Sequence, residues 1–451
     1  MKFNLLFKVI SLFILNACLF TRAESINECN EVKENWGDFI SQCKNDDAGK
    51  AYYLIVKYGI TQDLIDKIST FSELKTISFV YVPIDDELNF RPFRKNTKLN
   101  SVCFDNEKTG PYRLDYEPYR VRNKVIKYFP NLTLISFYHV IIGKSALDEI
   151  GTLTKLTSIE FHKTTFDDDA TFHSFKSLTN LTRLQIEAYK KTLKRVSTSL
   201  NYLTNLVNLE IRADGADFAF LSHPTLENLK SLKYLDVTND IGLDLKYIGS
   251  LTNLVLLILD CSNAKSFPNN IGNLKNLKEI TLFSSPIKTL PDSFGDLESL
   301  ENIYLASNEI ETIPESIGNL KNLRILNLGY NKIKEIPSSI GNLVNLEKLS
   351  LESNSIEVIP ESIGNLKKLD NLSLSYNKIE VIPESIGNLE NIVNLRLSNN
   401  NIQSIPDSIG NLQNLKYLYL NNNNITSIPD SLNNLSSIRE LNLNNNPIKS
   451  E

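Results

Sequence analysis

Residues with side chains that could support catalysis or bind a metal are present, but their spacing is not typical of an active site. Gly143-Lys144-Ser145 is similar to the end of a phosphate-binding loop, yet Tyr138 stands where that loop requires a glycine. The 451-residue chain has no GxSxG, GxGxxG, HExxH or CxxC motif. No metal-binding spacing relates its four histidines, His139, His162, His173 and His223. We therefore predict a protein that is not an enzyme and that uses no metal and no cofactor.

Charged side chains at alternate positions of short apolar segments provide binding chemistry instead. If these segments are β-strands, every second residue lies on the same face of a sheet. In the middle of the chain this face carries mainly carboxylates, accompanied by a few cations: Glu160, His162, Arg183, Glu187, Glu210, Arg212, Asp236 and Asp260. Such a surface is expected to attract a basic protein or peptide. The alternative is a solvated face, which must be polar in any case.

The corresponding positions nearer the C-terminus are mostly small and uncharged. A few larger residues stand among them: Tyr304, Arg396, Tyr417 and Tyr419. Tyrosine combined with serine and asparagine suits a glycan or a polar peptide, and a solvated face is again the alternative. Because the C-terminal segments are nearly identical to one another, recent duplication could explain them, and we expect the more specific site within residues 71–265.

One segment combines tyrosine and arginine at close intervals. Residues 110–122 hold the candidates for an adhesive loop: Tyr112, Arg113, Tyr116, Tyr119 and Arg120. Rigid aromatic faces and forked guanidinium donors are common in binding surfaces. The alternative is a long connection with one extra helix, packed against the protein by its tyrosines.

The strands and turns that position these residues belong to a repeated sequence. Eight prolines, Pro268, Pro291, Pro314, Pro337, Pro360, Pro383, Pro406 and Pro429, follow one another at intervals of 23 residues. A fixed period in the twenties is typical of a solenoid. In one period Leu326 and Leu328 alternate, so they are the inward side of a short strand, and stacked periods form a parallel sheet with one strand per coil. The Ile-Pro step then precedes a short helical turn that Gly318 is expected to end.

An asparagine recurs three residues after the second inward leucine of most regular coils. Its members are Asn308, Asn331, Asn354, Asn377, Asn400, Asn423 and Asn446. A short amide that turns into the core must be hydrogen-bonded, and we expect it to bond the backbone of its own coil and of the next coil. We predict a structural asparagine ladder here, which becomes patchy in the less regular coils.

The repeat consensus IPxxIGNLxNLxxLxLxxNxI resembles that of the leucine-rich repeat family. The repeat length of 23 residues is similar to that of the Ras-group type, and the consensus is also similar to that of the plant type. The resemblance covers residues 71–451, about 16 coils, of which 71–265 are degenerate and 266–451 are regular. It implies an α/β leucine-rich-repeat solenoid, a right-handed arc with a parallel concave sheet and short helical or 3-10 turns on its convex side. It also implies that the concave sheet binds partners.

Residues 1–23 are typical of a secretory signal peptide. Lys2 precedes an apolar run from Val9 to Phe20, and Thr21-Arg22-Ala23 provides small residues at the positions before cleavage. The run is short for a membrane span. An uncleaved anchor and, from Cys18, a bacterial lipoprotein signal are the alternatives. We expect a secreted or surface-exposed protein with no membrane span after cleavage of the signal.

Residues 24–70 carry no repeat, and we expect them to cap the first coil, with a disulfide between Cys29 and Cys43 that suits a secreted protein. Two reduced, buried cysteines are the alternative. Cys103 and Cys261 lie six coils apart, roughly 29 Å at about 4.8 Å per strand. A disulfide requires Cα atoms within about 7 Å, so we expect these two cysteines not to be joined.

Further features bear on partners. Five Asn-x-Ser/Thr triplets are candidate glycosylation sites: Asn131, Asn180, Asn371, Asn424 and Asn434. The repeats run to Glu451 with no polar cap, which leaves open either a dimer through this end or a truncated sequence. The net charge of −5 argues against nucleic-acid binding.

Together these features predict a non-catalytic recognition or adhesion protein that binds a protein or peptide, or a glycan, on its concave sheet. The alternative is an intracellular signalling scaffold of the Ras-group kind.

Overall fold

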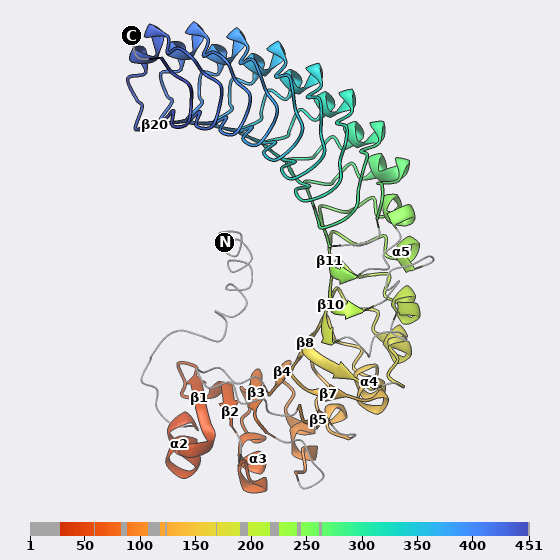
Figure 1. Cartoon of the computed structure of the whole chain (residues 1–451). Helices are drawn as coiled ribbons and strands as arrows, with labels where there is room; N and C mark the ends of the chain where they lie inside the picture. The colour runs from red at the N-terminus through yellow and green to blue at the C-terminus, as the bar shows by residue number, and fades with distance from the viewer. Residues whose placement is uncertain are drawn as a thin grey trace.

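The computed structural model describes residues 28–57, 59–82, 88–106, 118–121, 124–167, 169–189, 197–216, 225–240, 245–260 and 264–449. The predicted signal peptide lies outside these residues, as do Tyr112, Arg113, Tyr116 and Cys261. The described chain forms one long arc, with strands along its inner side and short helical elements along its outer side (Figure 1).

The concave sheet takes one strand from each coil, and each strand pairs in parallel with the strand of the next coil. Its less regular part consists of β2 (Ala51–Val56), β3 (Thr76–Val80), β4 (Ser101–Asp105), β6 (Leu134–Tyr138), β8 (Ser158–Phe166), β9 (Arg183–Tyr189), β10 (Asn208–Ala216), β11 (Tyr234–Asp240) and β12 (Leu256–Asp260). Its regular part continues with β13 (Glu279–Phe283), β14 (Asn302–Tyr304), β15 (Ile325–Asn327), β16 (Lys348–Ser350), β17 (Asn371–Ser373), β18 (Asn394–Arg396), β19 (Tyr417–Tyr419) and β20 (Glu440–Asn442). The sixteen coils expected from the sequence each supply one of the strands β3 to β20; β5 (Arg120–Val121) and β7 (Ile141–Ile142) belong to a second sheet and are not counted. This confirms the solenoid.

The convex side carries α3 (Gln62–Ile68), α4 (Lys144–Ile150), α5 (Thr225–Asn228) and 3-10 turns (Figure 1). The turns are η2 (Arg91–Lys95), η3 (Ile126–Tyr128), η4 (His173–Ser177), η5 (Ser197–Tyr202), η6 (Leu245–Ser250), η7 (Asn269–Asn273), η8 (Asp292–Asp296), η9 (Glu315–Asn319), η10 (Ser338–Asn342), η11 (Glu361–Asn365), η12 (Glu384–Asn388), η13 (Asp407–Asn411) and η14 (Asp430–Asn434). Gly318 lies inside η9 and does not end it, contrary to the sequence expectation. A Cβ at Gly318 would stand 2.6 Å from the Ser339 carbonyl oxygen, so the glycine permits close packing of successive turns.

The asparagine ladder is hydrogen-bonded within the core as predicted, but one of its two partner coils differs from the prediction. The Asn331 amide nitrogen donates to the carbonyl oxygens of Leu305 and Leu328, at 2.9 and 3.0 Å, and its oxygen accepts from Ile310 N at 2.9 Å. The second coil that it contacts is therefore the preceding one, and the predicted bond to the next coil is wrong. Tyr330, just before the asparagine, has φ of 58°, and the strand ends at this turn. Where Thr164 replaces the asparagine, β8 continues through a bulge to Phe166.

A second asparagine column, which the sequence reasoning missed, lies on the opposite edge of the coils. Asn345 donates to the Lys321 carbonyl oxygen at 2.7 Å and Asn391 to that of Lys367 at 2.7 Å. The same contact to the preceding coil is made by Asn180, Asn205, Asn253, Asn276, Asn322 and Asn414. These amides link successive coils on the side where each turn leads into the next strand.

The N-terminal end is closed by α2 (Glu28–Trp36), η1 (Gly37–Phe39) and β1 (Ile40–Asn45), which pairs antiparallel with β2. The predicted disulfide is present: Cys29 of α2 joins Cys43 of β1, with Cα atoms 5.5 Å apart. Strand β2 already pairs in parallel with β3. The parallel sheet thus begins within the segment that the sequence assigned entirely to a cap.

A small second sheet begins near the end of the candidate adhesive loop, residues 110–122. Strand β5 (Arg120–Val121) pairs with β7 (Ile141–Ile142), which pairs with the end of β8.

Strand β20 is the last strand of the concave sheet at its C-terminal side, where Leu441 is 40% exposed. In the described part of the chain, no helix has the length and apolar character needed to cross a bilayer.

Candidate functional site

The middle of the concave sheet carries a connected set of polar side chains, which we call the central charged network. It consists of Ser136, Glu160, His162, Arg183, Gln185, Glu187, Glu210, Arg212 and Asp236. These residues come from β6, β8, β9, β10 and β11, whose parallel register brings Ser136, Glu160, Gln185, Glu210 and Asp236 into one row. The row follows directly from the repeat, because each residue occupies the position between the two inward apolar residues of its strand.

His162 lies at the centre of the best-buried part of this network. Its Nε2 is 3.7 Å from Glu160 Oε2 and its Nδ1 is 3.8 Å from Glu187 Oε2, which are ion-pair distances and longer than hydrogen bonds. Burial lowers the pKa of the imidazole, but the two carboxylates raise it by more, to about 9. His162 is therefore a cation at neutral pH.

Glu160 is a nearly fully buried carboxylate, with 7% of its surface exposed. Ser136 Oγ donates to Glu160 Oε2 at 3.1 Å, and Arg183 Nε lies 3.5 Å from Oε1. Burial raises the pKa of this carboxyl, but His162, Arg183 and Ser136 together hold the pKa below its ordinary value. The charge on Glu160 is thus balanced within the protein.

The network continues from β9 to β11 through a relay of side-chain contacts. Gln185 Nε2 donates to Glu210 Oε1 at 3.3 Å. Arg212 Nη2 lies 2.8 Å from Glu210 Oε1 and donates to Asp236 Oδ2 at 3.3 Å. Burial and the charge of Glu210 raise the pKa of Asp236 to about 6, although Arg212 opposes this shift. Among the described atoms Asp236 Oδ1 is buried with no hydrogen-bond donor.

An apolar surface adjoins the acidic end of the network, and the sequence reasoning missed most of it. In register, Asp236 lies beside Ile258 of β12, and Asp260 of β12 lies beside Phe283 of β13. Ile258 and Phe283 are partly exposed on the concave face. The sequence does contain a sign of this surface. Ile258 is apolar at the strand position, between the two inward residues, where most other coils have a polar side chain.

The predicted C-terminal set is only partly brought together. Arg396 and Tyr419 are register partners on β18 and β19, with the guanidinium 5.4 Å from the ring centroid. Tyr419 donates its hydroxyl to Glu440 Oε2 at 2.9 Å, and Tyr417 is on the same strand. Tyr304, however, lies on β14, four strands before Arg396, or roughly 19 Å away at the spacing of a sheet. Tyr304 is instead the register partner of Thr281 on β13, which is the register partner of Ile258.

The two described residues of the predicted adhesive loop are engaged in the protein. The Tyr119 hydroxyl is buried without a hydrogen-bond partner among the described atoms, and burial, then the nearby Cys103 and Asp105, raises the pKa of the phenol. Arg120 forms an ion pair with Asp167 across the small second sheet. These contacts fit a packed connection for this part of the segment.

The candidate glycosylation sites differ in their surroundings. Asn180 is engaged through its amide nitrogen, which donates to the Thr154 carbonyl oxygen at 2.9 Å. Asn131 accepts from Lys155 Nζ at 2.6 Å through its oxygen, which leaves its nitrogen available. Asn371 lies on the concave sheet between the register partners Lys348 and Asn394. Asn424 and Asn434 are exposed.

The arrangement can hold a charged or polar partner through fixed ion pairs and hydrogen bonds. No group of three His, Cys, Asp or Glu residues within the described ranges is placed to hold a metal ion.

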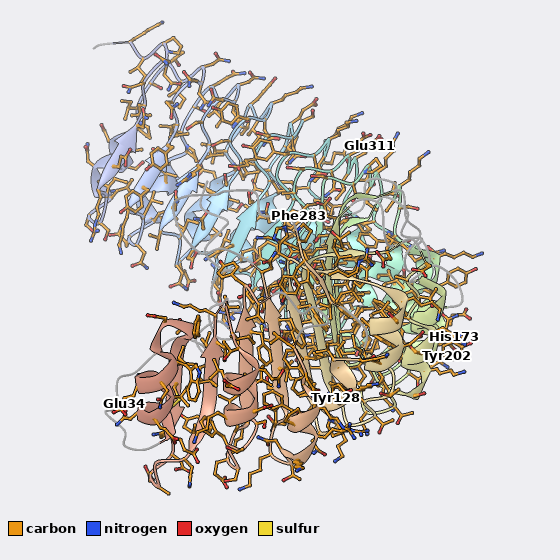
Figure 2. All side chains as sticks on the ribbon, turned by 90° about the horizontal axis from the view of Figure 1, so that it is seen from below. Glu34, Tyr128, His173, Tyr202, Phe283 and Glu311 are labelled. Carbon is orange, nitrogen blue, oxygen red and sulfur yellow. A yellow bond between two sulfur atoms is a disulfide. The ribbon has the colours of Figure 1, made fainter. Side chains whose placement is uncertain are left out.

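Figure 2 shows labelled residues on both sides of the arc: Tyr202 and His173 lie together on the outer side, whereas Phe283 lies toward the inner side.

Comparisons with solved structures find the same architecture. A leucine-rich repeat protein of Leptospira interrogans is 25% identical, with a TM-score of 0.66 and 95% of each chain covered. Toll of Drosophila, solved in the Toll–Spatzle complex, is 17% identical, with a TM-score of 0.69 over 94% of this chain and 60% of that one. The plant peptide hormone receptor RGFR1, solved with RGF2, is 22% identical, with a TM-score of 0.60 over 91% of this chain and 64% of the receptor. The chain thus spans less than two thirds of the length of the Toll and RGFR1 chains.

Sequence comparison identifies the family. No curated protein matches the chain. The sequence model of one family, described as a leucine-rich repeat region, matches residues 216–323, 302–377 and 371–450, which together make up more than half of the 451 residues. The chain belongs to the leucine-rich repeat family.

Proposed function

We propose that this chain is a non-catalytic recognition protein that binds a protein or peptide on its concave sheet. The observation that carries the proposal is the central charged network on β6 to β11, whose side chains are held by one another before any partner arrives. Preorganised side chains lose little conformational entropy on binding. Charges at fixed positions give specificity and fast association with a complementary partner.

The fold supports the same function. The plant receptor RGFR1 was solved in complex with RGF2, and Toll was solved in complex with Spatzle. Both proteins share the arc-shaped architecture with this chain, although their identity to it is below 25%. A rigid arc presents many strands to an extended ligand at a spacing of about 4.8 Å, which suits a peptide or a protein surface.

A peptide selection tests the binding function. Random 12-residue peptides displayed on phage are selected on the full chain, and the enriched peptides are synthesised and titrated calorimetrically. The variant Ile258→Arg/Tyr304→Arg places two bulky side chains on the concave sheet and should weaken binding at least tenfold. The control Asn269→Arg/Ser338→Arg adds the same charge at exposed positions of η7 and η10 and should stay within twofold. Equal affinities for the two variants would contradict the proposal.

We further propose that the protein is secreted or displayed at the cell surface. The signal-like residues 1–23 and the Cys29–Cys43 disulfide support this location, because disulfides persist mainly in oxidising compartments. The intact mass of protein from its own host tests it. A chain that starts at Glu24 and loses one disulfide on reduction is expected. A chain that retains Met1, with reduced Cys29 and Cys43, would instead favour the intracellular Ras-group scaffold.

A further inference from the structure

The acidic end of the network and the apolar surface beside it form one continuous area, which we call the acidic–apolar subsite. It consists of Asp236 on β11, Ile258 and Asp260 on β12, and Phe283 on β13. Ile258 is the register partner of Asp236, and Phe283 is the register partner of Asp260. Ile258 therefore has a carboxylate beside it on the preceding strand and another two residues further along its own strand.

The geometry of a sheet fixes the separation of these two carboxylates. Neighbouring strands lie about 4.8 Å apart and two residues along a strand rise about 6.6 Å, so the two Cα atoms are roughly 8 Å apart. A guanidinium or ammonium group placed between them reaches both carboxylates. Ile258 lies beside Asp236 on the sheet and Phe283 lies beside Asp260, and both apolar side chains are partly exposed.

The negative charge at this subsite is not balanced within the described protein. The concave positions of β11, β12 and β13 carry the carboxylates Asp236, Asp260 and Glu279, but no lysine, arginine or histidine. Arg212 on β10 is the cation that contacts Asp236, and it is shared with Glu210. By contrast, Glu160 at the other end of the network has two cations and a hydroxyl around it.

Burial makes this imbalance more costly. The side chain of Asp236 is 14% exposed, and its Oδ1 has no donor among the described atoms. Burial also raises the pKa of Asp260 and of Glu279, where Asn302 opposes the shift. A cation supplied by a partner would stabilise these carboxylates, whereas an anion would be repelled.

We propose that the acidic–apolar subsite binds an arginine or lysine side chain of a partner protein or peptide. The charged end lies between Asp236 and Asp260, and the aliphatic stem lies on Ile258 and against Phe283. A basic side chain has this divided character, because its methylene groups pack on apolar surface while its head keeps polar contacts. The inference rests on the proposed function of the concave sheet and specifies the chemistry of what binds there.

The enriched phage peptides test this inference through their sequences and affinities. Arginine or lysine next to an apolar residue is expected in the enriched peptides. Calorimetric titration of one such peptide should be at least tenfold weaker with Asp236→Asn/Asp260→Asn than with the wild-type chain. The control Asp407→Asn/Asp430→Asn removes the same charge from exposed convex turns and should stay within twofold.

A second variant guards against local unfolding at the buried Asp236. Phe283→Ala keeps every charge and should weaken the peptide three- to tenfold, with an unchanged circular dichroism spectrum. The inference is overturned if enriched peptides lack basic residues, or if the Asp236→Asn/Asp260→Asn and Phe283→Ala variants both bind within twofold of wild type. Peptides without basic residues that still lose affinity for the Ile258→Arg/Tyr304→Arg variant would leave the proposed function standing while removing this subsite.

Discussion

The imidazole of His162 lies parallel to the phenol ring of Tyr138, with 4.2 Å between ring centroids and 12° between ring planes. The two residues are register partners on β8 and β6, so the stack runs across the concave sheet. Glu160 and Glu187 lie close to the two ring nitrogens of the same imidazole. His162 is thus held as a cation on a fixed aromatic surface, and its titration reports on its ion pairs with Glu160 and Glu187.

The titration of His162 gives the first prediction. Its folded-state pKa of about 9 exceeds the ordinary value of 6.5, so protonation favours the folded state. This contribution is complete below pH 6.5 and is lost as the pH rises through 9; it is at most about 3.4 kcal/mol, at 1.36 kcal/mol per pKa unit. NMR titration of the imidazole signals, assigned by the variant His162→Gln, should show one histidine that titrates near pH 9. A value for His162 near 6.5 would show that the ion pairs do not form.

The asparagine ladder gives the second prediction. Asn377→Ala removes donors to the Leu351 and Leu374 carbonyl oxygens and the acceptor of Ile356 N, all within buried surroundings. Leaving these groups unpaired should lower the free energy of unfolding by about 2–4 kcal/mol. The matched variant Asn391→Ala removes one exposed bond to the Lys367 carbonyl oxygen and should cost less than about 1 kcal/mol. Urea unfolding curves compare the two, and equal losses would rule out the special role of the buried column.

The glycines of the convex turns give the third prediction. A Cβ at Gly341 would lie 2.4 Å from the carbonyl oxygen of Ser362 and 2.7 Å from the Cβ of Ser362. The variant Gly341→Ala must therefore push apart the coils that contain η10 and η11. Overpacking of this kind costs about 1–3 kcal/mol. At Gly329 the nearest atom is Cγ of the flexible Glu352, at 3.1 Å, and Gly329→Ala should stay within about 0.5 kcal/mol of wild type. Thermal unfolding of the two variants distinguishes these positions, and a more stable Gly341→Ala protein would contradict the packing argument.

The disulfide gives the fourth prediction. Cys29 and Cys43 are 14 residues apart, and a bridge across such a loop typically contributes about 3 kcal/mol. In the variant Cys29→Ala/Cys43→Ala, α2 and β1 lose their covalent link, and the edge of β2 opens first. Amide hydrogen exchange should accelerate in residues 40–56 and stay unchanged in residues 302–442. Uniform acceleration along the whole arc would instead indicate that the solenoid unfolds as a single unit.

Most of the fold could be predicted from the sequence because each coil repeats the same physical pattern. Leu326 and Leu328 define the inward face of one strand, and the 23-residue period carries that register through every regular coil. The start of the parallel sheet at β2 was missed, because Leu54 and Val56 precede the first segment that matches the repeat consensus. The close approach at Gly318 was also missed, since it depends on where the next coil packs.

The candidate site was predictable only as a face. The strand register expected from the repeat predicts which residues lie on the concave face of the sheet. Glu160, His162 and Asp236 were therefore among the predicted residues. Which ion pairs form could not be predicted, because His162 lies between Glu160 and Glu187 only through the stacking of two particular coils. The partly exposed Ile258 was overlooked, since an apolar residue in a leucine-rich sequence is indistinguishable from core until the strand register is fixed.

Photo-crosslinking tests the central claim, recognition by the concave sheet, most directly. The photoreactive amino acid p-benzoylphenylalanine replaces Tyr304 on β14 in one variant and Tyr202 on the convex turn η5 in another; Tyr202 is 52% exposed. Each variant is irradiated with a peptide enriched in the selection. Crosslinks from position 304, with none from position 202, are the predicted result. Crosslinks from position 202, with none from position 304, would place the partner on the outer side and contradict the account.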